Sequence, residues 1–169
     1  MLRTGVLLMS LPEIRAAREA DRAAIERLLS SAQLPLDGLS EALPTMFVAT
    51  EPSASASMND AELVGVAGFE HCCDNALLRP VAVAPQWQGR GLGRALVERS
   101  IAEAESRGIH ALYLLTMTAE RYFPAFGFER VARESVPADI RETKEFREAC
   151  PASATVMRRA NATASTEAT

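Results

Sequence analysis

The residue types best suited to binding an anion lie in one short stretch, residues 88–93, which read Gln-Gly-Arg-Gly-Leu-Gly. Glycines at alternate positions let the main chain approach a phosphate closely and adopt conformations closed to other residues. An apolar run ends at Pro85, and an amphipathic pattern continues from the stretch to about Gly108. A glycine turn at the start of a helix presents unpaired backbone N–H groups, and the helix dipole adds positive potential there. We therefore predict a phosphate-binding loop, with Arg90 and Arg94 supplying charge.

The spacing of these glycines separates three types of phosphate loop. The Walker type needs a Gly-Lys-Ser or Gly-Lys-Thr ending, which the stretch lacks. The dinucleotide type, G-x-G-x-x-G, fits poorly because Gly89, Gly91 and Gly93 are two residues apart and Arg94 follows them. A third pattern, Q/R-x-x-G-x-G/A, is met completely by residues 88–93. On this pattern the chain resembles the GNAT family of acyl-CoA-dependent N-acetyltransferases, whose pyrophosphate loop has this form.

The resemblance implies a fold, a co-substrate and a set of binding residues. The fold would be the α/β acyl-CoA N-acyltransferase fold, a mixed, mostly antiparallel twisted sheet flanked by helices and splayed at its central strand. Acetyl-CoA would be the co-substrate, without a metal, with its pyrophosphate on the glycine loop and its pantetheine paired with the strand before that loop. The residues assigned to the cofactor are Val81, Ala82, Val83, Gln88, Gly89, Arg90, Gly91, Leu92, Gly93, Arg94 and Thr116.

The strand before the loop contains an anomaly that suits a splayed sheet. Residues 76–83 form a nearly continuous apolar run, which is typical of a central strand, but Pro80 interrupts it. Because proline has no N–H to donate to a ladder, we expect the strand to be bulged or splayed at this point. A splayed strand leaves backbone groups that can pair with an extended, amide-bearing ligand such as pantetheine.

A second resemblance to the family lies in residues 119–128, within a predicted helix at 118–126. Many members have a tyrosine four residues before the glycine of this segment, and it protonates the departing CoA thiolate. Here Phe123 occupies that position, and Tyr122 stands one residue earlier, about 100° round a helix. The thiolate would be protonated by water, by Tyr122 or by the ammonium product. We retain Tyr122 as the catalytic candidate.

Two ionisable residues are candidates for handling the acceptor. Arg79 falls among apolar residues in mid-strand, where a buried guanidinium needs an anionic partner. That partner would be either a substrate carboxylate or phosphonate, through a bidentate contact, or Glu70 on the neighbouring strand. Glu70 could accept a proton from the substrate ammonium, directly or through a water, although a solvated strand-end glutamate is the plain alternative. We assign Arg79 to substrate binding and Glu70 to catalysis.

The other elements indicate one α/β domain of residues 13–159, after an N-terminal extension at 1–12 and before a flexible tail at 160–169. A loop or second short helix is expected at 34–39 and a flexible hairpin loop at 52–60. The predicted strands are 13–17, 46–50, 62–70, 76–83, 111–115 and 154–158, and the predicted helices are 19–29, 91–107, 118–126 and 137–149.

Composition narrows the possible partners. A net charge of −4 argues against nucleic acid or an anionic membrane as a partner. Three cysteines and two histidines show neither a disulfide framework nor the spacing of metal ligands. No apolar stretch is long enough to span a membrane, so we expect a cytoplasmic protein, as a monomer or homodimer.

A narrower resemblance covers residues 14–158. Segments 76–83, 113–120, 136–146 and 150–154 look like the GNAT subgroup linked to arsenic resistance, called ArsN2. That likeness implies acetylation of a small amine by direct attack on the thioester, with organoarsenical and phosphinothricin-like amino acids as suggested acceptors. Two alternatives stay open, which are an acetyltransferase for protein N-termini or lysines and a catalytically silent acyl-CoA-binding domain.

Overall fold

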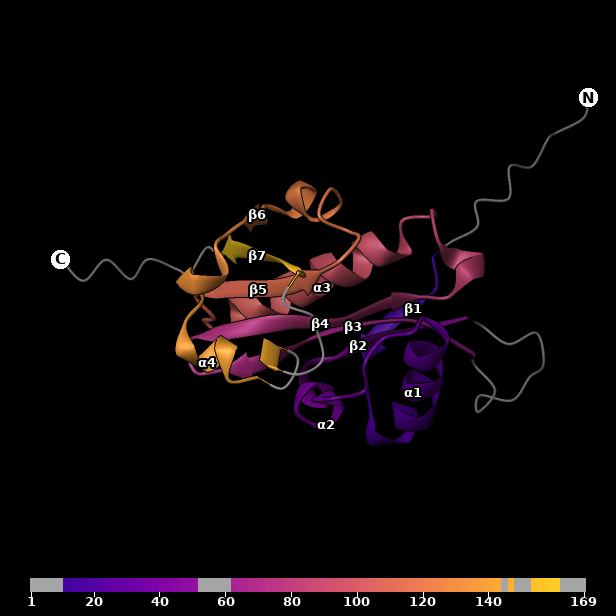
Figure 1. Cartoon of the computed structure of the whole chain (residues 1–169). Helices are drawn as coiled ribbons and strands as arrows, with labels where there is room; N and C mark the ends of the chain where they lie inside the picture. The colour runs from indigo at the N-terminus through magenta and orange to yellow at the C-terminus, as the bar shows by residue number, and fades with distance from the viewer. Residues whose placement is uncertain (1–10, 52–61, 144–145, 148–152, 162–169) are drawn as a thin grey trace, which may run out of the picture.

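Seven strands form one twisted sheet through the middle of the molecule (Figure 1). They are β1 (Glu13–Ala16), β2 (Phe47–Glu51), β3 (Glu62–Cys72), β4 (Asn75–Val83), β5 (Ala111–Thr116), β6 (Glu129–Arg130) and β7 (Thr155–Ala160). The structure, a computed structural model, describes residues 11–51, 62–143, 146–147 and 153–161. The strand order is β1-β2-β3-β4-β5-β7-β6, and only β4 and β5 run parallel among the described pairs. The predicted mixed, mostly antiparallel sheet is confirmed.

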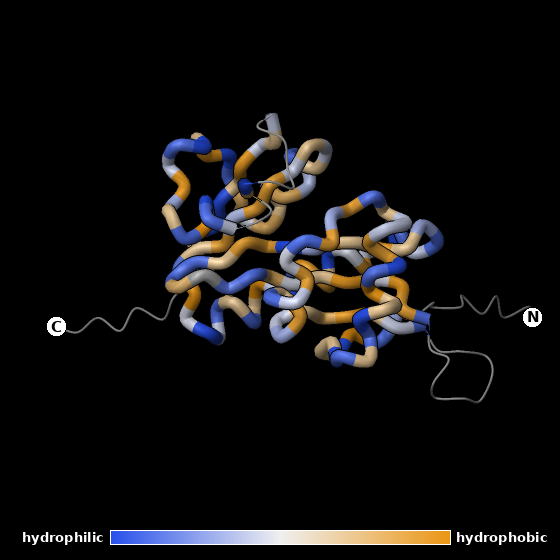
Figure 2. Tube along the Cα trace, turned by 60° about the horizontal axis from the view of Figure 1, so that its bottom comes forward, coloured by the Kyte–Doolittle hydropathy of each residue, from blue (hydrophilic) through white to orange (hydrophobic). Residues whose placement is uncertain are grey.

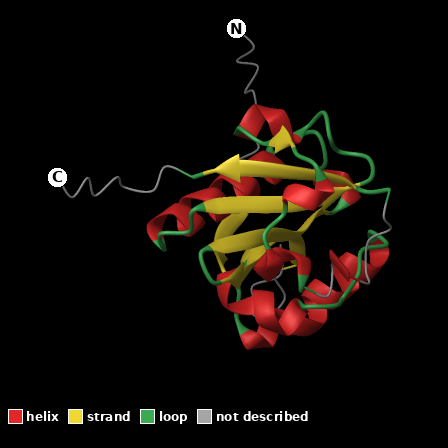
Figure 3. Ribbon diagram, turned by 60° about the vertical axis from the view of Figure 1, so that its left-hand side comes forward, coloured by secondary structure: helices red, strands yellow, loops and turns green. Residues whose placement is uncertain are grey.

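Helices cover both faces of this sheet. The α-helices are α1 (Arg22–Ser31), α2 (Leu39–Ala42), α3 (Leu92–Ser106) and α4 (Ala138–Arg141). The 3-10 helices are η1 (Glu19–Asp21), η2 (Leu43–Thr45), η3 (Pro85–Trp87), η4 (Phe123–Phe126) and η5 (Arg133–Ser135). Helix α3 lies on one face, and α1 and α2 lie on the other (Figures 1 and 3). The hydrophobic residues gather in the sheet between these layers, and the polar residues gather in the outer turns (Figure 2).

Strand β4 is both bulged and splayed, as expected from the position of Pro80 within it. The register of β3 with β4 shifts between Ala67 and Phe69, where β4 places both Arg79 and Pro80 against one residue of its neighbour. On its other edge, β4 pairs with β5 only as far as Leu77. Beyond that residue the two parallel strands diverge, and their facing edges are left for other partners.

The helix predicted at residues 118–126 is wrong, since this segment consists of turns followed by the short helix η4. Pro124 explains the difference, because proline donates no backbone hydrogen bond and is tolerated only in the first turn of a helix, where η4 places it. Tyr122 is the residue just before η4, where its N–H donates to the Ala119 carbonyl at 3.0 Å. Tyr122 has helical backbone angles, but it precedes a short 3-10 helix instead of lying within an α-helix.

The last strand extends slightly past residue 159, where the domain was predicted to end. Strand β7 runs to Ala160, and Asn161 Nδ2 donates to the Ile109 carbonyl at 2.9 Å, one to two residues beyond the expected boundary. Of the helix predicted at 137–149, α4 is described as far as Arg141. The expected extension at 1–10, the loop at 52–60 and the tail at 162–169 lie outside the described residues.

Within the ranges that the structure describes, no helix combines the length and the apolar character needed to cross a membrane.

Candidate active site

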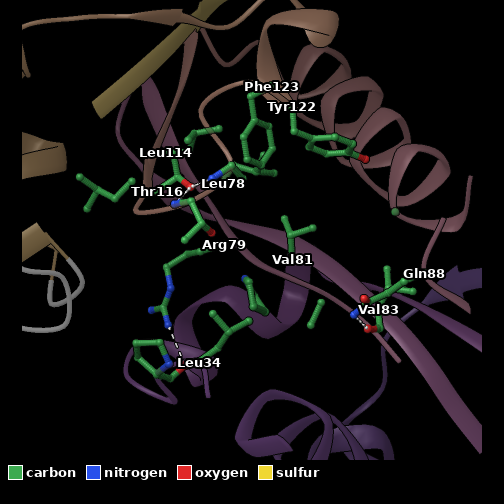
Figure 4. A pocket seen from close by; sticks show the side chains of 17 residues that line it. Leu34, Leu78, Arg79, Val81, Val83, Gln88, Leu114, Thr116, Tyr122 and Phe123 are labelled. Carbon is green, nitrogen blue, oxygen red and sulfur yellow. Dashed lines mark hydrogen bonds between the residues drawn. The ribbon is translucent and has the colours of Figure 1, made fainter. Parts of the chain in front are cut away.

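A cavity of about 620 Å³ opens where β4 and β5 diverge (Figure 4). Its walls come from the loop between α1 and α2, from β4 and the start of α3, from the end of β5, and from the segment that leads into η4. The lining residues are Leu34, Pro35, Leu78, Arg79, Pro80, Val81, Ala82, Val83, Gln88, Gly93, Leu114, Leu115, Thr116, Thr118, Ala119, Tyr122 and Phe123. The cavity is thus a direct product of the splay.

The glycine loop lies at one end of this cavity. Gly89 and Gly91 have φ values of 75° and 86°, which favour glycine over residues with side chains. Gly91 is the N-cap of α3, and the first N–H groups of a helix have no acceptor within the helix. A β carbon on Gly89 or on Gly91 would meet no atom of the described residues within 4 Å. The loop therefore offers backbone donors on an open surface, which suits a pyrophosphate.

Six of the predicted cofactor residues line the cavity, and five do not. The lining residues are Val81, Ala82, Val83, Gln88, Gly93 and Thr116, and the others, which belong to the same loop and helix start, are Gly89, Arg90, Gly91, Leu92 and Arg94. Gln88 Nε2 donates to the Val83 carbonyl at 3.1 Å, which ties the loop to the end of β4 (Figure 4). The side chain of Leu92 is fully buried in the core, so it can face a ligand only through its backbone N–H.

The two arginines of the loop are held by neighbouring side chains. The guanidinium of Arg90 lies 5.3 Å from the ring centre of Trp87. Arg94 Nε donates to Glu98 at 3.0 Å, and its guanidinium lies 5.9 Å from the ring centre of Phe126. Both arginines are exposed beside the glycine loop, where they add positive potential.

Tyr122 and Phe123 both reach the cavity but lie in different environments. Phe123 is 7% exposed and packs against Phe128 with the ring centres 5.6 Å apart. Tyr122 is 42% exposed and turns its ring toward the start of α3 (Figure 4). Burial raises the pKa of the Tyr122 phenol, Arg94 opposes this shift and Glu98 adds to it. A tyrosine is protonated at neutral pH even without this shift, and the protonated form is the one a proton donor needs.

Arg79 also lines the cavity, and its guanidinium has partners within the protein. The residue is 5% exposed, and it donates through Nη1 to the Asp37 carbonyl and through Nη2 to the Pro35 carbonyl at 3.3 Å. Glu70 Oε2 lies 3.9 Å from Nη1. The ion pair that the sequence allowed as an alternative is thus present, and the same arginine faces the cavity.

Glu70 lies behind Arg79 rather than in the cavity wall. Its side chain is 12% exposed, and it is not among the described residues that line the cavity. A role as the base that deprotonates the acceptor remains a prediction. In the structure, the carboxylate of Glu70 lies close to the guanidinium of Arg79 and stabilises its positive charge.

Several lining residues were missed by sequence reasoning. Leu114, Leu115 and Ala119 carry no polar group, and Thr118 has only a hydroxyl, so their residue types gave no signal. Thr116 Oγ1 accepts hydrogen bonds from the N–H groups of Thr118 at 3.3 Å and Ala119 at 2.9 Å, which turns the chain at the end of β5. A threonine two residues before another, just after an apolar run, is the pattern that could have indicated this turn.

No group of three or more His, Cys, Asp or Glu side chains in the described ranges could hold a metal ion.

The fold and the glycine loop define an acyltransferase of the GNAT class, and the comparison of sequences gives the family. The profile of the acetyltransferase (GNAT) domain matches residues 45–130, half of the chain. The chain therefore belongs to the GNAT family. It is an acetyl-CoA-dependent N-acetyltransferase that acts on amines.

Two relatives of known activity match very different lengths of the chain. An amino-acid acetyltransferase of Mycobacterium tuberculosis is 29% identical over 137 residues, which are 76% of this chain and 75% of the relative. A ribosomal-protein-bS18-alanine N-acetyltransferase of Escherichia coli is 51% identical over 41 residues, which are only 24% of this chain and 28% of that protein.

Solved structures support the fold. Rv2747 from Mycobacterium tuberculosis, in complex with CoA, aligns with a TM-score of 0.71 and 24% identity over 88% of this chain and 99% of that one. An N-acetylglutamate synthase from Neisseria gonorrhoeae, complexed with coenzyme A and N-acetyl-glutamate, also has a TM-score of 0.71, with 20% identity. That alignment covers 89% of this chain and 35% of the synthase.

Proposed function

We propose that the protein transfers the acetyl group of acetyl-CoA to the primary amine of a small, amino-acid-like acceptor. The observation that carries this proposal is the single cavity wall running from the glycine loop, along β4, to Arg79 and the α1–α2 loop. A cofactor and an acceptor entering from its two ends would meet at the splay. Holding both reactants in one complex supplies much of the rate acceleration for direct attack.

The cofactor end is proposed to use backbone groups. The pyrophosphate would lie on Gly89 to Gly93, with Arg90 and Arg94 nearby, and the pantetheine would extend along Val81 to Val83. Backbone N–H groups of the splayed strand would polarise the thioester carbonyl, which stabilises the charge that develops during attack. Tyr122, which is protonated at neutral pH, would then protonate the CoA thiolate, and its phenolate would recover the proton released by the acylated nitrogen.

The acceptor end supports a small molecule. It is walled by Leu34, Pro35, Leu114 and Leu115, with the guanidinium of Arg79 as its charged group. An acceptor with a short apolar part and a carboxylate or phosphonate fits this chemistry, and Arg79 is the proposed contact for that anion. The extended match to an amino-acid acetyltransferase supports this class. The resemblance to the arsenic-resistance subgroup adds organoarsenical and phosphinothricin-like amino acids as candidates.

A second candidate is acetylation of a protein N-terminus. The 51% identity to the bS18-alanine acetyltransferase favours it, although that match spans only 41 residues. A peptide acceptor would need an open groove past the α1–α2 loop, where Leu34 and Pro35 now form part of the cavity wall.

An acceptor screen by release of free CoA thiol tests the proposal. The panel should contain the standard amino acids, phosphinothricin, an arsenical amino acid, simple amines and a peptide that begins with alanine. Turnover of amino-acid-like compounds with no turnover of the peptide would support the proposal. Turnover of the peptide alone would replace it with the second candidate, and no turnover of any amine would contradict both.

A further inference from the structure

The α1–α2 loop, residues 32–38, forms the acceptor-side wall of the cavity. Two of its residues, one near each end, have a left-handed backbone conformation. Gln33 has a φ of 57° and Gly38 has a φ of 77°. Between them, Leu34 and Pro35 face the cavity. Leu34 N–H donates to the Leu29 carbonyl at 2.9 Å, which fixes the loop where it leaves α1. The position of the rest of the loop depends on contacts with the sheet.

Arg79 supplies such contacts from the middle of β4. It is 42 residues from Asp37 and 44 residues from Pro35 in sequence, and its guanidinium donates to both of their carbonyls. Figure 4 shows the side chain extending from β4 toward the loop that carries Leu34, on the side away from Tyr122. Glu70 Oε2, 3.9 Å from Nη1, supports the guanidinium from the neighbouring strand. A buried arginine thus bridges the sheet and the loop.

Gly38 makes this close approach possible. A β carbon at residue 38 would overlap Arg79 Nη1 and lie 3.1 Å from Glu70 Oε2. The backbone at Gly38 therefore packs directly on the ion pair, and there is no space for even a methyl group. Gly38, Glu70 and Arg79 form one contact unit, which we call the loop clamp.

We propose that the loop clamp determines which acceptors the enzyme uses, by holding the α1–α2 loop at a fixed distance from β5. Buried ion pairs contribute little net stability compared with apolar packing, but they fix geometry because each hydrogen bond has a direction. Arg79 is in this respect a positioning residue. The inference rests on the proposed function, since it takes the loop side of the cavity as the acceptor side.

Two substitutions test the clamp in different ways. Arg79→Met removes the guanidinium and keeps most of the side-chain length. Gly38→Ala keeps both charges and forces the loop and the guanidinium apart. Gly108→Ala is the matched control, because Gly108 has a φ of 72° and a β carbon there would meet no atom of the described residues within 4 Å. The control thus carries the same backbone strain without the overlap.

The first measurement is amide hydrogen exchange of residues 33–39 in the protein without ligand. We expect exchange there to rise roughly tenfold to hundredfold in Arg79→Met and Gly38→Ala, as for the loss of hydrogen bonds to a charged group. Gly108→Ala should leave exchange at 33–39 unchanged. Unchanged exchange in Gly38→Ala, or in a folded Arg79→Met protein, would overturn the proposal.

The second measurement is acceptor choice among uncharged amides, which removes any direct role of Arg79 in binding an acceptor anion. We expect the ratio of kcat/KM for phenylalaninamide to that for glycinamide to rise roughly tenfold or more in both clamp variants and to stay constant in Gly108→Ala. An unchanged ratio would show that the position of the loop does not determine which acceptor is used, and this would contradict the proposal. If the wild-type protein acetylated no primary amine, the proposed function would fail, and the exchange measurement would still decide whether the clamp holds the loop.

Discussion

The hydroxyl of Tyr122 lies 3.4 Å from the position that a β carbon on Gly93 would occupy. This places the phenol over the first turn of α3, directly beside the glycine loop. A β carbon at Gly93 would be in ordinary van der Waals contact with this hydroxyl, so the phenol packs directly against the third glycine of the loop. The phenol therefore lies on the side of the cavity that is proposed for the cofactor.

Replacing Tyr122 with Phe removes only that hydroxyl. We predict a fall in kcat of roughly 10² or more, the usual contribution of a general acid, with the affinity for acetyl-CoA retained. Tyr113→Phe is the control, because Tyr113 is the other tyrosine of the chain, is buried, and accepts a hydrogen bond from Arg158 Nε at 3.2 Å. A fall below tenfold in Tyr122→Phe would assign the proton to water or to the ammonium product.

The pH dependence of kcat gives an independent test of the same residue. Burial raises the pKa of Tyr122 above its usual value of about 10. The protonated form, which can donate, therefore persists to higher pH than in a solvated tyrosine. We expect no loss of kcat from this group between neutral pH and about 10. An alkaline fall below about pH 9 that is absent from Tyr122→Phe would show that the pKa of Tyr122 is lowered rather than raised, and would contradict this prediction.

Gly91→Val tests the pyrophosphate loop. The new side chain would project into the open surface of the loop and strain a backbone with a φ of 86°. We predict that acetyl-CoA affinity, measured by calorimetry, falls roughly tenfold or more. Gly108→Val, at the other end of α3, carries a similar strain of about 1–3 kcal/mol and should bind acetyl-CoA normally. Equal affinities in the two folded variants would remove the assignment of the loop.

Arg79→Lys and Arg79→Ala test whether Arg79 also contacts an acceptor anion. We predict that the KM for the acceptor alanine rises in both variants. The rise should be roughly tenfold to hundredfold in Arg79→Ala and smaller in Arg79→Lys, because lysine keeps the charge but cannot make a bidentate contact. Alaninamide serves as the matched neutral acceptor. Movement of the α1–α2 loop would affect both acceptors alike, so only a change in their ratio reports the charge. An unchanged ratio would leave Arg79 with the positioning role alone.

The sequence predicted those parts of the fold that depend on local pattern. Pro80 in an apolar run indicated the bulge and the splay, because a missing N–H has the same consequence in any central strand. The glycines at 89, 91 and 93 indicated the turn into α3 for a similar reason. Both signals are local, and both elements lie where they were expected.

The parts that could not be predicted depend on contacts between distant segments. Nothing near Arg79 in the sequence points to the carbonyls of Pro35 and Asp37, which the fold brings to it across more than 40 residues. The direction of Tyr122 was inferred from an α-helix at 118–126, but the segment before η4 consists of turns. In each case the tertiary arrangement, rather than the residue type, decides what the side chain can do.

The splay also divides the described sheet into two sets of strands that follow one another along the chain. Strands β1 to β4 come from residues 13–83, and β5 to β7 come from residues 111–160, with the glycine loop and α3 between them. The two sets share backbone pairing only over Asn75–Leu77 of β4. A ligand that lies between β4 and β5 would occupy the place of a missing strand. Saturation with acetyl-CoA at 100 times its Kd would then add about 2.7 kcal/mol to the free energy of unfolding, so the co-substrate would act as a structural part of the sheet it reacts in.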